Sequence, residues 1–224
     1  MTNTKQFTAS RESKSKAKKY RGIAIVAWIL AMAGQIVAIL KLLHKDQLTW
    51  LPIAIGLILA LAITGNILWK KANRLDPASE KNKFKFFVQN QLGAILGVLA
   101  FLPLVIFIFT NKNMDKKSKG IAGTVAIVAL LIAGATGIDL NPASIESYTE
   151  EINKQTNTLK TLNHNTDAVF WTKAGNKYHI NKDCQHIKGR ESISNGSVKE
   201  SWEQKGISEL CKTCEKRARK LDVE

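Results

Sequence analysis

The residues with the clearest chemical potential gather near the end of the chain. All three cysteines lie there, in the pattern His179-x4-Cys184-x26-Cys211-x2-Cys214. A Cys-x2-Cys pair in a tight turn offers two thiolates to one ion, and a second pair from a distant segment closes a tetrahedral site. The spacing therefore predicts a zinc site with His179, Cys184, Cys211 and Cys214 as ligands.

Other uses of these residues fit the pattern less well. His186 competes with His179 for the fourth position, but it follows Cys184 by only two residues, and a Cys-x-His pair meets one metal with more strain. A disulfide framework would leave an odd cysteine. A thioredoxin-like Cys-x-x-Cys expects a preceding strand in a βαβ pattern, and a catalytic cysteine expects an isolated thiol beside a base. We therefore favour His179 as the fourth ligand and predict no catalytic residue.

The segment that carries these ligands is small. Residues 169–172 and 177–180 are β-prone and flank turn residues, which predicts a hairpin. Ser197 to Glu200 fits a capping box that opens a short helix ending at Gly206, and residues 209–221 fit a last helix. The core candidates are few: Val169, Trp171, Tyr178, Ile180, Ile187, Trp202, Ile207 and Leu210. So small a module is hard to stabilise by burial alone, and a structural metal would contribute folding energy directly.

Long apolar runs fill the first part of the chain. They predict four transmembrane helices at about residues 22–43, 50–69, 88–110 and 120–138, each long enough for a hydrocarbon core of roughly 30 Å. Pro103 is expected to kink the third helix. The predicted fold class is thus a membrane α-helical domain with a small α+β zinc-binding module at the C-terminus.

The remaining boundaries follow from the polar segments. Residues 1–21 read as a basic, disordered tail, 22–138 as the transmembrane domain, 139–167 as a helical linker and 168–224 as the zinc-binding module. Asn141-Pro142 is expected to start the linker helix, because Pro fits the first helical turn. Residues 163–167, including His164, are expected to form the loop that ends it.

The positive charge belongs to the membrane half. The chain has a net charge of +15, and residues 1–138 hold 19 Lys and Arg against 5 Asp and Glu, while residues 139–224 hold 14 against 13. Positive flanks are expected for topology alone, so overall basicity is weak support for nucleic-acid binding. The N-terminal tail and residues 70–85 carry most of these cations. The positive-inside rule therefore predicts that the N-terminal tail, residues 70–85 and the C-terminal module lie on the cytoplasmic side of the cell membrane.

The predicted helices look like an anchor in the lipid bilayer. No Asp, Glu, Lys, Arg or His falls within an apolar run, which disfavours a transporter or pump. Gln35, Asn66 and Thr124 are expected to make hydrogen bonds between helices. Gly93-xxx-Gly97 allows close helix approach, either within the chain or in a homo-oligomer.

The run from Trp171 to His179, followed by Cys184 and Cys211-x2-Cys214, resembles the Ada-type metal-binding module of bacterial methyl-phosphotriester repair proteins. The resemblance covers about residues 168–220. It implies a zinc site that in the repair proteins has four thiolates, one of which accepts a methyl group from DNA phosphate. His179 stands where that strand-borne cysteine would be, so the resemblance implies a structural or binding site and not methyl transfer. The whole chain also resembles four-helix membrane proteins of lactic-acid-type bacteria, which supplies an architecture and no activity.

These observations predict a membrane-anchored, non-catalytic zinc module that presents a surface to a partner, protein or nucleic acid. The nucleic-acid option rests on cations of the last predicted helix, namely Lys212, Lys216, Arg217, Arg219 and Lys220. The alternative is a metal or thiol-redox stress sensor in which loss of zinc is the signal. A DNA-repair or nuclease-related enzyme is least favoured, because the sequence shows no paired carboxylates, nucleophile–base pair or phosphate-cradling glycine loop.

Overall fold

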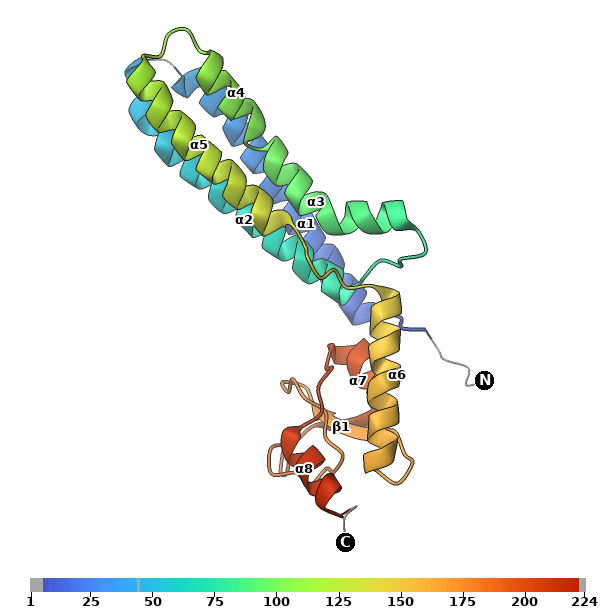
Figure 1. The fold of residues 1–224 in the computed structure, drawn as a ribbon. Coiled ribbons are helices and arrows are strands. Elements are labelled where there is room, and N and C mark those ends of the chain that lie inside the picture. The colour runs from blue at the N-terminus through green and yellow to red at the C-terminus, as the bar shows by residue number, and fades with distance from the viewer. Residues whose placement is uncertain (1–5, 44, 222–224) are drawn as a thin grey trace. The chain divides into compact units, whose positions relative to one another are not determined.

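The computed structural model describes residues 6–43 and 45–221. The chain forms two compact units (Figure 1). The helical unit comprises Lys16–Arg74 and Lys81–Pro142. The C-terminal unit is built from the described parts of three segments: Met1–Ser15, Leu75–Glu80 and Ala143–Glu224.

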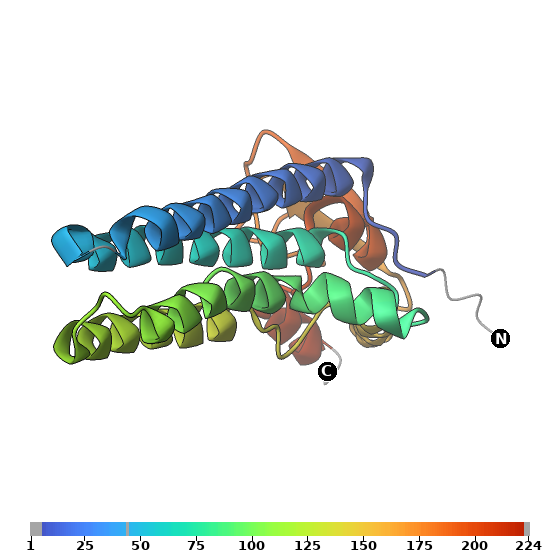
Figure 2. The ribbon, with the colours of Figure 1, turned by 90° about the horizontal axis from the view of Figure 1, so that it is seen from above.

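Four helical stretches are long and apolar enough to cross a membrane: Arg11–Leu42, Leu48–Leu75, Lys83–Thr110 and Lys116–Gly137. They contain α1 (Arg11–Val37), which a π-helical turn extends to Leu42, then α2 (Leu51–Leu75), α3 (Lys83–Leu99), α4 (Leu102–Thr110) and α5 (Lys116–Gly137). The helices of this unit run side by side in Figures 1 and 2. Hydropathy therefore located the apolar helices correctly.

Two expectations for these helices differ from the structure. The expected disordered tail is wrong for residues 11–21, because α1 begins at Arg11; residues 1–5 lie outside the described residues. Ser10 caps this helix start, since its hydroxyl accepts from the Ser13 N–H at 3.1 Å. The third apolar run is two helices rather than one kinked helix, and Pro103 lies in the first turn of α4.

Polar side chains inside the helical unit tie helices together. The buried Asn66 accepts from Trp28 Nε1 at 3.2 Å and donates to the Ala133 carbonyl at 3.0 Å, which joins α1, α2 and α5. The expectation for Asn66 is confirmed. The expected hydrogen bond between helices is wrong for Thr124, whose exposed hydroxyl donates to the Gly120 carbonyl of its own helix.

Small residues set the spacing between α3 and α5. Gly93 faces Gly137, and Gly97 faces the backbone of Ala133. A Cβ at Gly137 would lie against the backbone of Gly93 and Ala94, closer than real Cβ atoms approach. The expected close approach at Gly93-xxx-Gly97 thus occurs within the chain.

Gly137→Ala is expected to destabilise the helical unit by about 1–3 kcal/mol, because the new methyl group must push two backbones apart. Gly120→Ala, on the same helix with open space around its Cα, is the matched control and should be neutral or slightly stabilising. Thermal unfolding of both variants in detergent measures the difference. Equal midpoints would contradict the close packing of α3 and α5.

The C-terminal unit contains α6 (Ile145–Leu162), β1 (Ala168–Thr172), β2 (Ile193–Ser197), α7 (Val198–Lys205) and α8 (Lys212–Leu221). The two strands pair antiparallel, with Trp171 opposite Ser194. The predicted hairpin is therefore wrong as a ladder: residues 177–180 pair with β1 only through the bridge between Phe170 and His179, and Tyr178 forms a second bridge with Leu210. The predicted capping box at Ser197 and the helix end at Gly206 are confirmed.

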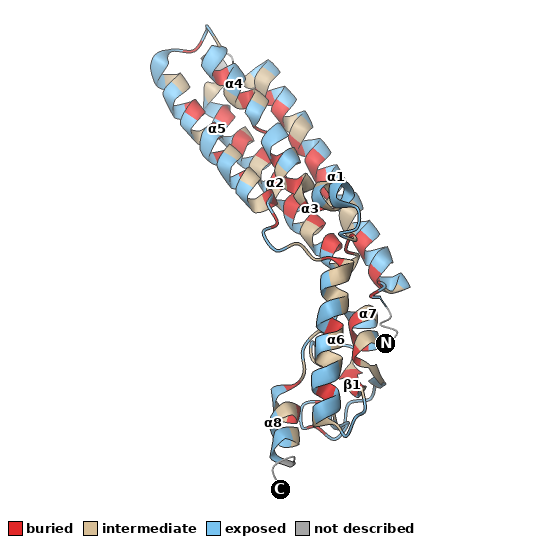
Figure 3. Ribbon diagram, turned by 45° about the vertical axis from the view of Figure 1, so that its right-hand side comes forward, coloured by how far each residue is buried: buried red, intermediate tan, exposed pale blue. Residues whose placement is uncertain are grey.

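The helix expected as a linker belongs to the core of this unit. Leu159 of α6 is buried with Val169, Trp171 and Tyr178, and most of the remaining surface of α6 is exposed or intermediate (Figure 3). The helix starts at Ile145 with Ser144 as its cap, and not at Asn141-Pro142, because Ser144 and Ser147 form a reciprocal capping box. The unit is therefore larger than residues 168–224.

A segment from the start of the chain also packs into this unit. The Phe7 ring meets the Tyr148 ring edge-on at 5.2 Å, and Tyr148 in turn contacts Trp202. The Phe7 N–H donates to the Thr149 hydroxyl at 2.9 Å, and the Thr8 N–H donates to the Glu203 carboxylate at 2.9 Å. The N-terminal segment is thus part of the C-terminal fold.

Candidate metal centre

His179 is held beside β1 by backbone hydrogen bonds. Its N–H donates to the Phe170 carbonyl at 2.7 Å, and its carbonyl accepts from the Phe170 N–H at 2.8 Å. Neighbouring residues of an extended segment point to opposite sides, and both Tyr178 and His179 are buried. Tyr178 packs in the core with Trp171, while the His179 imidazole lies beside the cysteines.

Cys184 sits at a tight turn. Its N–H donates to the Asn181 carbonyl at 3.1 Å, and its own carbonyl accepts from the N–H groups of Ile187 at 2.9 Å and Lys188 at 2.8 Å. Ile187 is buried against the cysteine side chains. These bonds fix the Cys184 backbone although the segment has no regular secondary structure.

Cys211 and Cys214 lie at the start of α8. The Cys211 N–H donates to the Tyr178 carbonyl at 2.9 Å, and the Cys211 carbonyl accepts from the Glu215 N–H at 3.0 Å. The helix begins at Lys212, one residue later than Cys211. The start of α8 is thereby tied directly to the segment that carries His179.

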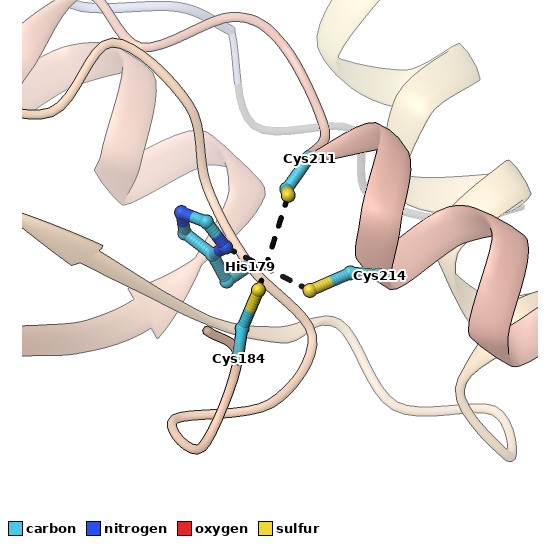
Figure 4. Close-up of side chains that lie close together, drawn as sticks. All are labelled: His179, Cys184, Cys211 and Cys214. Carbon is cyan, nitrogen blue, oxygen red and sulfur yellow. Dashed lines mark hydrogen bonds between the residues drawn. The ribbon is translucent and has the colours of Figure 1, made fainter. Parts of the chain in front are cut away.

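The four donor atoms converge (Figure 4). All four residues are buried, and one ligand atom of each lies within 4.8 Å of every other. The sulfurs of Cys184 and Cys211 are 4.0 Å apart, and Cys214 Sγ lies 3.7 Å from His179 Nδ1. Donors at metal distances of about 2.0–2.3 Å in a tetrahedron are separated by roughly 3.3–3.8 Å. The donor atoms must therefore move together by up to about 1 Å to hold one tetrahedral ion.

His186, the competing ligand, lies outside this group. Its side chain is exposed, and its Nε2 lies 3.1 Å from the hydroxyl of Thr213. Its ring centre is 6.4 Å from that of His179. His164 is exposed in a left-handed turn with φ 46°. Among the described residues, the geometry therefore selects the same four residues as the sequence pattern.

The electrostatics of the group favour a bound cation. Burial lowers the pKa of His179, and the neighbouring His186 lowers it further, which keeps the imidazole neutral and able to donate an electron pair. Burial raises the pKa of Cys214 to about 12. Burial also disfavours ionisation of Cys211, but N–H groups of Cys214 and Thr213 outweigh it and lower the pKa of this thiol. Several thiolates cannot ionise together here unless a positive ion joins them.

A cavity of about 770 Å³ borders this centre. His179 and Cys211 line it on one side, and Lys173, Arg190 and Lys212 contribute cationic side chains. The sequence pattern indicated a cationic surface only on the last helix, and it did not single out Lys173 and Arg190. They are far apart in the sequence, so no local pattern marks them.

No protein-family model, curated protein or solved structure matches this chain. The function is therefore argued from the site and the fold.

Metal analysis of the purified full chain is expected to find one ion per chain, lost in Cys211→Ser because a buried thiolate ligand is removed. His179→Ala should lower metal affinity strongly, and His186→Ala, the matched control on the exposed histidine, should leave metal content unchanged. Elemental analysis after dialysis against a weak chelator measures all three. Loss of the ion in His186→Ala with retention in His179→Ala would show that the ligand set is wrong.

Proposed function

We propose that this protein is a membrane-anchored, non-catalytic zinc module that presents a surface to a partner. The observation that carries the proposal is the convergence of three buried cysteines and one buried histidine within 4.8 Å. Thiolate and imidazole donors in tetrahedral array suit zinc above other common ions.

The number of ligands supports a structural role. Four protein ligands complete a tetrahedral site, whereas catalytic zinc keeps a position open for water or substrate. The Ada-type resemblance fits the same reading, because His179 stands where a reactive thiolate would be and an imidazole cannot accept a methyl group in that way. In this proposal, the module has a four-ligand zinc site like that of the Ada-type modules but does not accept a methyl group.

The composition of the C-terminal unit supports an even number of membrane crossings. The segment before α1, the segment between α2 and α3, and the chain after α5 all fold into this unit. Segments that fold together must lie on the same side of a membrane. If each of the four apolar stretches crosses the membrane once, these three segments all lie on one side. The cations of residues 5–21, most of them in the first turns of α1, and those of residues 70–85, around the end of α2 and the start of α3, favour the cytoplasmic side.

The partner surface that we propose is the cationic cavity beside the zinc centre, continued by α8. Lys173, Arg190 and Lys212 line the cavity, and Lys212 opens α8. Arg219 is engaged with Glu215 at 2.9 Å and contributes less. A partner with anionic groups, such as a nucleic acid or an acidic protein segment, complements this surface.

Removal of the metal is expected to unfold the C-terminal unit and spare the helical unit. Structural zinc contributes on the order of 10 kcal/mol of folding free energy at neutral pH, more than a small module can replace by burial. A strong chelator should abolish the near-ultraviolet circular dichroism of Trp171 and Trp202 and open the unit to trypsin, and added zinc should restore both.

The matched control is Cys211→Ser, whose C-terminal unit should already be sensitive to trypsin and should not respond to chelator. Unchanged dichroism and protease resistance after complete metal removal from the wild-type chain would contradict a structural role.

Nucleic-acid binding is the sharper form of the partner proposal. The full chain in detergent should bind a DNA duplex at about 50 mM salt and lose most of this affinity by about 200 mM, as phosphate-driven binding does. Arg190→Gln with Lys212→Gln should weaken binding, whereas Lys112→Gln with Lys117→Gln, exposed cations of the helical unit, should not. Absence of binding at low salt would leave an acidic protein segment as the partner class.

A further inference from the structure

A groove of about 390 Å³ lies in the helical unit. It is formed where α1 enters the unit, α2 ends and α3 begins, and its lining includes Arg21, Trp69, Phe84, Lys85, Val88 and Leu92. The first turns of α3 lean away from the line of the other helices (Figure 1). Its volume is within the range of small-molecule sites.

The base of the groove is rigid. The Trp69 indole N–H donates to the Gln89 carbonyl at 2.7 Å, which fixes the ring against α3. The Arg21 guanidinium lies 5.9 Å from the centre of that ring, a cation–π arrangement. Arg21 Nη2 also approaches Asn73 Oδ1 at 3.5 Å. A cation is therefore held at the groove.

One wall of the groove is apolar. Phe84, Val88 and Leu92 follow one another at four-residue intervals on α3, so they lie on one face of the helix. Phe84 is 79% exposed and Phe87 is 58% exposed. Exposed aromatic rings beside lysines are typical of helix segments at a membrane–water interface.

The charged side chains that line the groove, Arg21 and Lys85, are both cations, and the nearest carboxylates in sequence to α3 are Asp76 and Glu80 of the preceding connection. Lys83 and Lys85 are exposed at the start of α3, and neither α2 nor α3 contains Asp or Glu. The one carboxylate on α1 is Glu12, nine positions before Arg21 and thus roughly 13 Å along the helix. An apolar wall with cations at its rim complements a molecule that has a hydrocarbon chain and an anionic head.

We propose that this groove binds one anionic glycerophospholipid. Its phosphate lies between Arg21 and Lys85, and one acyl chain follows Phe84, Val88 and Leu92. The site rests on the proposal that the helices span a bilayer, and it does not depend on the metal centre. Anionic lipids of the cytoplasmic leaflet are the ligand class that the predicted orientation supplies.

Native mass spectrometry of the full chain in detergent tests this site, with phosphatidylglycerol and phosphatidylcholine of identical acyl chains as probes. The wild type should retain one phosphatidylglycerol in preference to phosphatidylcholine. Each cation removed should lower that preference about fivefold, in Lys85→Gln and further in Arg21→Gln with Lys85→Gln. Lys85 is exposed, so the single variant keeps the test valid if loss of Arg21 disturbs folding.

Lys112→Gln with Lys117→Gln removes two exposed cations outside the groove and is the matched control, which should keep the preference. Equal retention of both lipids by the wild type, or an equal loss in control and groove variants, overturns the site. Release of the bound lipid by millimolar glycerol 3-phosphate would show a headgroup site without an acyl groove and overturn it as well. Zinc content measured on the same samples separates failure of the lipid site from failure of the metal proposal.

Discussion

Three separate segments of the C-terminal unit bring four possible metal ligands together, and we propose that one ion joins them. The segment beside β1 brings His179, the following turn brings Cys184, and the start of α8 brings Cys211 and Cys214. The hydrogen bond from the Cys211 N–H to the Tyr178 carbonyl joins the first and last of them. Neighbouring buried thiolates repel one another without a cation. In the proposed metal-bound state, the ion removes this repulsion and crosslinks the three segments.

The packing around the centre supports a structural role for the proposed metal. β1 and β2 are five-residue strands that pair with each other, and a two-stranded sheet is marginal by itself. The core beside it is made by Trp171, Tyr178 and Leu159. The unit supplements this core with a segment from the opposite end of the chain, through Phe7 and Tyr148. We therefore propose that burial and metal binding together stabilise the fold.

The sequence predicts local features well. Ligand spacing singled out the four residues that converge, hydropathy located the apolar helices, and the Ser197 to Glu200 pattern identified a capping box that is present. Each of these signals depends on residues close together or on a chemically rare residue type. Pro103 likewise marked the break in the third apolar run.

The sequence does not predict contacts between distant segments. β1 forms its ladder with residues 193–197, whereas the nearer residues 177–180 contribute a single bridge to it, from His179 to Phe170. The contact of Phe7 with Tyr148 joins residues that are far apart in the sequence. The turn of φ 76° at Gly189 precedes Arg190, which reaches the cavity. None of these placements has a periodic or compositional signal, so they follow only from the folded structure.

X-ray absorption spectroscopy at the zinc edge, on the full chain purified without added metal, tests whether three cysteines and one histidine bind zinc. We expect three sulfur ligands at about 2.3 Å and one nitrogen ligand at about 2.0–2.1 Å from the zinc ion. A spectrum dominated by oxygen and nitrogen ligands, or one with two sulfurs and a bound water, would contradict a closed centre formed by His179, Cys184, Cys211 and Cys214.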